Sequence, residues 1–197
     1  SIGLNPFVYD DANKIAITIS SVLKSMFNIS KTESDEIYRD DIITQAIENL
    51  SLLLKEMYPR MNDGVLPNLS DMLKMLTNFD LVEKMAEILS HDEELKEKYS
   101  VQLAYFRTHF YKNGSNRAVT EKYIYTAVSQ LDNLLRLPGV KTILCNRYNN
   151  LDFDKMLANG DVTFVCTRRG DLGATSNKAF GLFFLISMQN AVLRRPG

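Results

Sequence analysis

The sequence predicts a mainly α-helical protein. We expect a helical domain of about six helices, residues 10–138, inserted into a small α/β unit that the two chain ends form, residues 1–9 and 139–197. Three observations predict this class: apolar residues recur at helical spacing through the middle of the chain, strand-like residues precede them, and the β-branched runs 140–145 and 162–167 follow them. Because an insertion leaves and re-enters its host at neighbouring points, the two flanks should meet in space.

The first two helices are predicted from their caps and their apolar spacing. Asp10 or Asp11 can cap the first helix, since its carboxylate accepts hydrogen bonds from unpaired amides. Ser34 opens the second helix, whose acidic first turn suits the positive end of the helix dipole, and Pro59 ends it. The core-facing residues are expected to be Ile15, Ile19, Val22, Leu23 and Met26 in the first helix, and Ile42, Ile43, Ala46, Ile47, Leu50, Leu53 and Leu54 in the second.

Three further helices are predicted before residue 112. Ser70 caps a short helix, an amphipathic segment covers residues 81–89, and a longer helix covers residues 92–111. The last of these begins with three acidic residues, 92–94, which we interpret as a solvated helix N-terminus. It ends with aromatic residues at Tyr99, Tyr105, Phe106, Phe110 and Tyr111.

The sixth helix follows a polar break at residues 112–116. Thr120 begins it, and Pro138 with Gly139 closes it. Most of the eight methionines stand at core spacing, so we interpret them as packing residues and not as an adhesive surface.

The C-terminal flank predicts half of an α/β nucleotide-binding unit. A strand at residues 161–167 leads into a turn with Gly170 and Gly173, and a helix follows at residues 174–193. This helix is apolar on nearly every face, so it must be buried all round. Two or three short strands are too few to cover it, which predicts that the chain belongs to a larger protein and self-associates on its own.

Composition restricts the class of function. At 197 residues and 45% hydrophobic content the chain can bury a sizeable core. A net charge of -1 gives no argument for a polycation that binds DNA. The two cysteines, Cys145 and Cys166, lie in apolar runs and predict buried free thiols in a reducing, cytoplasmic setting. The sequence has no pattern typical of a signal peptide or a membrane span.

Motifs for catalysis are missing. The chain has no phosphate-binding loop with the Gly-x-x-x-x-Gly-Lys-Ser/Thr pattern, and no apolar run ending in the acidic pair that holds Mg²⁺. His91 and His109 have no cysteine or carboxylate at metal-ligand spacing, and His109 among aromatic residues predicts a packed side chain. We therefore expect no catalytic residue, metal site or cofactor in this chain.

Arg168 and Arg169 are the strongest candidate binding residues. They follow a predicted strand and precede a glycine turn and a helix N-terminus, at the edge of an α/β sheet that bears ligands. Guanidinium groups bind phosphate through paired hydrogen bonds. Equally, one arginine could pair with Asp171 while the other is solvated.

Several segments together resemble the TraG/TraD-like coupling proteins of type IV secretion, the conjugative-transfer ATPases of Gram-positive mobile elements. They are LNPF at 4–7, NNLDF at 149–153, GDVTF at 160–164, RRGDLG at 168–173, and FGL at 180–182 continuing to RRPG at 194–197. The resemblance is specific at the two ends, and the middle matches only as a helical insertion. These proteins belong to the FtsK–HerA superfamily of hexameric DNA pumps.

The resemblance implies an all-α domain inserted into a RecA-like motor, facing the cytoplasm and helping to receive a relaxase–DNA substrate. The parent protein would be a membrane-attached hexamer that uses ATP and Mg²⁺. Arg168 and Arg169 would then stand at a strand end of the motor, where they could reach a neighbouring subunit's nucleotide. The motor's nucleotide loop and acidic motif are not in this chain, so no catalytic residue carries over.

The leading hypothesis is thus a partner-recognition domain without activity of its own, whose partner is the relaxase or another DNA-processing protein. The alternatives are the same region of a related secretion-energising ATPase, a helical scaffold unconnected with DNA, and a self-sufficient phosphate-binding enzyme. We expect weak DNA binding or none, and any DNA contact should trace to Arg168, Arg169, Arg194 and Arg195.

Overall fold

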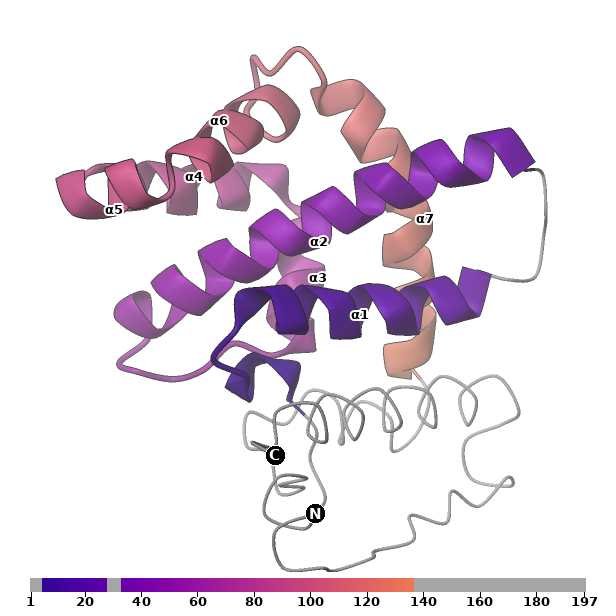
Figure 1. Ribbon diagram of the computed structural model, residues 1–197, viewed down its shortest axis with the longest axis horizontal. Coiled ribbons are helices and arrows are strands. Elements are labelled where there is room, and N and C mark those ends of the chain that lie inside the picture. The colour runs from indigo at the N-terminus through magenta and orange to yellow at the C-terminus, as the bar shows by residue number, and fades with distance from the viewer. Residues whose placement is uncertain (1–4, 28–32, 137–197) are drawn as a thin grey trace, which may run out of the picture.

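The computed structural model describes residues 5–27 and 33–136 of the 197-residue chain. These residues form a bundle of seven α-helices preceded by one 3-10 turn, and the described part contains no strand. The elements are η1 (Pro6–Val8), α1 (Ala12–Phe27), α2 (Glu33–Met61), α3 (Leu69–Thr77), α4 (Phe79–Ser90), α5 (Glu93–Lys98), α6 (Ser100–His109) and α7 (Arg117–Arg136) (Figure 1). The mainly helical class is confirmed. The predicted α/β flank of residues 1–9 and 139–197 is not shown, because residues 1–4 and 139–197 lie outside the described residues and residues 6–8 form a 3-10 turn.

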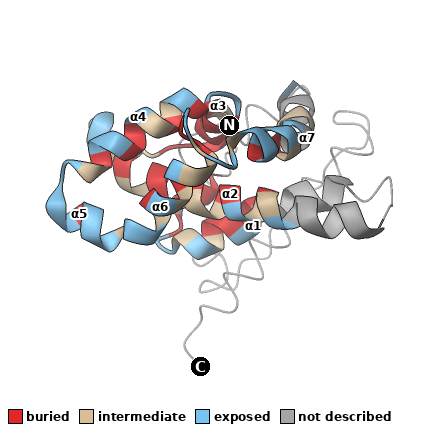
Figure 2. Cartoon of the chain, turned by 90° about the horizontal axis from the view of Figure 1, so that it is seen from above, coloured by how far each residue is buried: buried red, intermediate tan, exposed pale blue. Residues whose placement is uncertain are grey.

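The 29-residue helix α2 organises the bundle. It packs against α1, α3, α4 and α7, while α6 packs against α4 and α7. Buried residues face inward where these helices meet (Figure 2). The predicted core positions of α2 are confirmed at six residues: Ile43, Ala46, Ile47, Leu50, Leu53 and Leu54.

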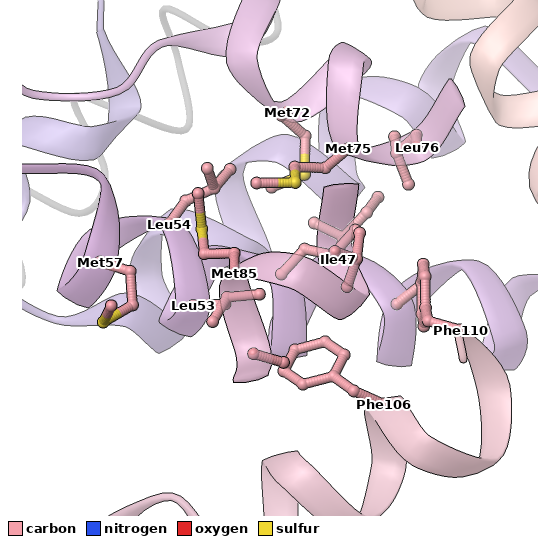
Figure 3. Packing of buried hydrophobic residues seen from close by; sticks show 14 of the residues in the cluster. Ile47, Leu53, Leu54, Met57, Met72, Met75, Leu76, Met85, Phe106 and Phe110 are labelled. Atoms are coloured by element: carbon pink, nitrogen blue, oxygen red, sulfur yellow. The ribbon is translucent and has the colours of Figure 1, made fainter. Parts of the chain in front are cut away.

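Methionines fill the centre of the core. Met57, Met72, Met75 and Met85 are all at most 5% exposed. They come from α2, α3 and α4, and their side chains gather around Leu54 (Figure 3). Unbranched thioether side chains fill irregular gaps between helices that cross at different angles. The prediction that methionines serve packing is confirmed at these four positions.

The N-terminal turn is part of this core. Asn5 caps η1 by accepting a hydrogen bond from the Phe7 amide, and Pro6 occupies the first turn position, where a missing N–H costs nothing. Phe7 is fully buried, Lys55 donates from Nζ to its carbonyl oxygen at 2.7 Å, and Asn5 donates to the carbonyl of Pro67 at 2.8 Å.

The end of α2 differs from the prediction because packing overrides the local signal of a proline. Helix α2 continues through Pro59 to Met61. A proline near the end of a helix removes one hydrogen bond, the one to the carbonyl four residues before it. The packing of the preceding turns of α2 stabilises the helix by more than this loss. The chain leaves α2 through Asp63 and Gly64, both at positive φ, with the Gly64 amide bonded to the Pro59 carbonyl at 2.8 Å.

The cap of α3 is Asn68 and not Ser70. The Asn68 side chain accepts from the Asp71 amide at 3.2 Å, and the Asp71 carboxylate accepts from the Asn68 amide at 2.9 Å. This reciprocal pair is a capping box, which satisfies two amides at once. Asp11 caps α1 by accepting from the Asn13 amide at 2.8 Å, as the sequence predicted for one of two aspartates.

The single helix predicted over residues 92–111 is two helices. Tyr99 leaves helical geometry, with φ -106 and ψ 24, and separates α5 from α6. Helix α7 begins at Arg117, three residues before the predicted start at Thr120. Thr120 is buried inside the first turn of α7, where its amide and its hydroxyl both donate to the carbonyl of Asn116.

Both ends of the described chain lie at one edge of the bundle. Figure 1 shows η1 and the last turn of α7 along the lower edge, with α4, α5 and α6 at the opposite, upper side. None of the helices in residues 5–27 and 33–136 combines the length and hydropathy that a membrane crossing requires.

Candidate functional site

The described residues contain a groove where α5 and α6 meet at Tyr99. Its volume is about 570 Å³, and it is open to solvent on one side. The lining residues are Glu93, Glu94, Lys96, Glu97, Ser100, Leu103 and Arg107. Three of them, Ser100, Leu103 and Arg107, stand at positions i, i+3 and i+7 and so share one face of α6.

Helix α5 is stabilised by a capping residue at its start and by charged residues at both ends. Asp92 caps it by accepting from the amides of Glu94 and Leu95, at 3.0 and 3.1 Å. Glu93 and Glu94 lie at its positive end, and Lys96 and Lys98 lie in its last turn, where each charge suits the helix dipole. Only Leu95 is buried, so α5 presents almost its whole surface to solvent (Figure 2).

The junction between α5 and α6 is fastened to α2 through Glu56. The Tyr99 hydroxyl donates to Oε1 of Glu56 at 3.3 Å, and Nζ of Lys98 approaches the same oxygen at 3.8 Å. Arg60 pairs with Oε2 of Glu56 at 3.7 Å. Partial burial, and secondarily the Glu56 carboxylate, raise the pKa of Tyr99, so the hydroxyl keeps its proton and remains the donor. The contacts of Tyr99 and Lys98 therefore hold the α5–α6 junction against α2.

The carboxylates that line the groove do not take part in the contacts that hold the described helices together. No hydrogen bond or ion pair within residues 5–27 and 33–136 engages the side-chain oxygens of Glu93, Glu94 or Glu97. Lys96 and Arg107 also line the groove, so the negative potential is confined to its α5 side, where three acidic residues stand beside one lysine.

The acidic residues of α4 differ in this respect. Asp80 pairs with Arg117 at 3.2 Å and with Lys112 at 3.9 Å, and Glu83 accepts from the Lys112 amide at 3.0 Å. Glu87 accepts from the Tyr111 hydroxyl at 2.6 Å. These bonds tie the loop after α6 to α4. The network is therefore structural, since each carboxylate already has a donor.

His109 is packed as the sequence predicted. Its ring stacks on Tyr105 with centroids 4.4 Å apart, and its Nδ1 lies 2.8 Å from the Thr120 hydroxyl. Burial lowers the pKa of His109 below its ordinary value. His91 is exposed at the end of α4. No group of three potential metal ligands comes together in the described part of the chain.

The candidate residues from the sequence, Arg168, Arg169, Arg194 and Arg195, lie outside the described residues, as do both cysteines. The structure adds a site that the sequence did not indicate. Asp92, Glu93 and Glu94 do form a helix N-terminus, as interpreted, but their neighbourhood depends on the bend at Tyr99. No local signal predicts that bend, because residues 92–111 read as one continuous helix.

The described fold and groove define a general class: an all-α bundle that carries an open, charged groove at one end. Comparison of the chain with models of protein families, with curated proteins and with solved structures gives no match.

Proposed function

We propose that this chain is the partner-recognition all-α domain, with its α/β flanks, of a TraG/TraD-like coupling ATPase of a type IV secretion system. In this proposal the domain receives a relaxase–DNA complex on behalf of the motor. The supporting observation is the position of the two described ends. Both η1 and the end of α7 lie at one edge of the bundle, as an insertion requires, and the helices α5 and α6 lie on the opposite side (Figure 1).

The charge distribution supports a protein partner in preference to nucleic acid. Residues 10–138 carry 20 acidic and 15 basic side chains, a net charge of -5, whereas residues 139–197 carry 4 acidic and 8 basic side chains, a net charge of +4. Nucleic-acid affinity comes largely from neutralising phosphates with basic residues. The helical domain is therefore proposed to bind protein, and any contact with DNA is assigned to the basic C-terminal flank.

The parent protein is proposed to hydrolyse ATP with Mg²⁺ as a hexamer attached to the inner membrane, with this domain on its cytoplasmic side. This chain contributes recognition and no catalytic group. The parts of the motor that hold nucleotide are assigned to other segments of the parent, because the phosphate-binding loop and the acidic magnesium motif are missing from this sequence.

The test is a quantitative binding assay of the 197-residue chain against the relaxase and accessory proteins of the same mobile element. Labelled single-stranded DNA and an unrelated acidic helical protein serve as controls. Saturable binding to a DNA-processing protein is expected. Binding only to proteins unconnected with DNA transfer would favour a helical scaffold, and ATP turnover by the chain alone would overturn the recognition role.

A further inference from the structure

We propose that the groove between α5 and α6 binds a short peptide segment of a partner protein, with basic residues at one end of the segment and an aliphatic residue beside them. This inference rests on the proposed recognition function and deepens it. It assigns the contact to one surface and states the chemistry of the occupant.

The shape of the groove suits a peptide. A volume of about 570 Å³ lies within the range of about 300–1,000 Å³ that is typical of ligand sites. Leu103 is 2% exposed and forms an apolar floor, and Ser100 adds a small residue at the bend. Leu103 is the one apolar side chain of the lining, so the groove offers one contact to an aliphatic side chain of the partner.

The charges of the groove determine the sign of the partner. Glu93, Glu94 and Glu97 line it without any hydrogen bond or ion pair inside the described part of the chain, whereas the α4 carboxylates are all engaged. A basic side chain that binds there gains three carboxylates without breaking a folding contact. Lys96 lines the same side of the groove and offsets part of this attraction, so the α5 side keeps a net charge of -2 from three acidic residues and one basic residue.

Arg107 limits how far the basic stretch can extend. It lies seven residues after Ser100, which is about 10 Å along α6 at the rise of an α-helix. A continuous basic run across the groove would meet this guanidinium and be repelled. The preferred segment therefore carries its basic residues beside α5 and a neutral or acidic residue beside Arg107. The three carboxylates would repel the phosphates of a nucleic acid in the same place.

The test begins with selection of a random 12-residue peptide library against the whole 197-residue chain. Selected peptides are expected to be enriched in lysine and arginine at one end, next to an aliphatic residue. The affinity of the best selected peptide is then measured by fluorescence anisotropy. The groove variant carries Glu93→Gln, Glu94→Gln and Glu97→Gln, and should bind about tenfold more weakly, because it lacks three exposed ion pairs.

The matched control carries Asp41→Asn, Asp63→Asn and Glu121→Gln. It removes the same three charges from exposed positions that do not line the groove, and should bind within about twofold of the wild type. A second groove variant, Ser100→Trp, fills the space without removing a carboxylate and should also weaken binding. It keeps the test informative if the triple glutamine variant fails to fold.

The proposal is overturned if the selected peptides lack basic residues, or if the groove and control variants weaken binding equally. It is also overturned if Ser100→Trp has no effect. A wrong recognition function would give a different result in the two binding assays. In that case basic peptides would still bind the groove, while the relaxase and accessory proteins would not bind the chain at all.

Discussion

The hydroxyl of Tyr111 donates a 2.6 Å hydrogen bond to Oε1 of Glu87, and so joins the loop after α6 to the middle of α4. Burial raises the pKa of Tyr111 strongly, with the hydrogen bond to Glu87 as the next cause, so the proton stays on the hydroxyl. Lys112 of the same loop and Arg117, the first residue of α7, also contact α4. The three contacts hold the loop and the start of α7 against α4.

We expect Tyr111→Phe to lower the free energy of unfolding by about 1 kcal/mol, the usual net value of one hydrogen bond. The loss is limited because Glu87 is exposed and regains water. Urea denaturation measures the change. Tyr125→Phe is the control, since the Tyr125 side chain is 73% exposed, and its substitution should have no measurable effect. Equal losses in the two variants would show that the bond to Glu87 is not the cause.

Gly114→Ala is expected to destabilise the fold by about 1–3 kcal/mol, as overpacking does. A Cβ at position 114 would lie 2.5 Å from the carbonyl oxygen of Thr108, a backbone atom that also accepts the Asn116 amide. The backbone would have to move, and the contacts between the loop and α4 would move with it. Thermal unfolding followed by circular dichroism tests this. Ser115→Ala, at the exposed neighbouring position, should leave the unfolding temperature unchanged.

The cap of α3 allows a direct comparison of structure and sequence. Asn68→Ala should cost about 1 kcal/mol, because it removes the acceptor for the Asp71 amide and breaks the capping box. Ser70→Ala, at the position that the sequence predicted as the cap, should cost much less. Chemical denaturation of both variants decides between the two caps. A larger loss for Ser70→Ala would contradict the structure.

Stability should fall as the pH is lowered through the titration of His109. Burial lowers the pKa of this side chain in the folded state, so the unfolded chain, with a histidine pKa of about 6.5, takes up the proton first. Folding is therefore most favoured above about pH 6.5, and that contribution is lost as the pH falls toward the lower pKa of the folded state. Urea denaturation at pH values between about 5.5 and 7.5 should show this slope. His109→Gln should flatten it, and an unchanged slope would assign it to other groups.

DNA binding by the chain should be weak and should depend on its C-terminal arginines. We expect Arg168→Ala with Arg169→Ala to reduce the dependence of log affinity for a labelled single strand on log salt by roughly 1.4, the value for two phosphate contacts. Anisotropy titrations at about 50 mM and about 200 mM salt measure this slope. Arg60→Ala, on the helical domain, is the control and should leave it unchanged. Tight binding that survives both high salt and the double substitution would place the DNA site on the helices.

Sequence patterns predicted most of the helical domain because they report local interactions. Asp11 stands where a cap is needed, and residues such as Ile47 and Leu50 recur at the spacing of one buried helix face. The boundaries were predicted less well. Pro59 lies inside α2 because packing of the helix outweighs the loss of one hydrogen bond. Asn68 caps α3 through its reciprocal hydrogen bonds with Asp71, three residues later, and the prediction of Ser70 did not take this pair into account.

The sequence by itself determined the helical class, the approximate positions of the helices, the packing role of several methionines and the absence of phosphate-binding motifs from the chain. These depend on residue type and spacing within one or two helical turns. Only the tertiary structure decided that α5 and α6 separate at Tyr99, where Glu56, 43 residues earlier, holds the bend. It also decided that Asp80, Glu83 and Glu87 are engaged while Glu93, Glu94 and Glu97 have no partner among the described residues. All six are acidic residues on the neighbouring helices α4 and α5, and their difference comes from contacts between distant segments, which local sequence patterns do not encode.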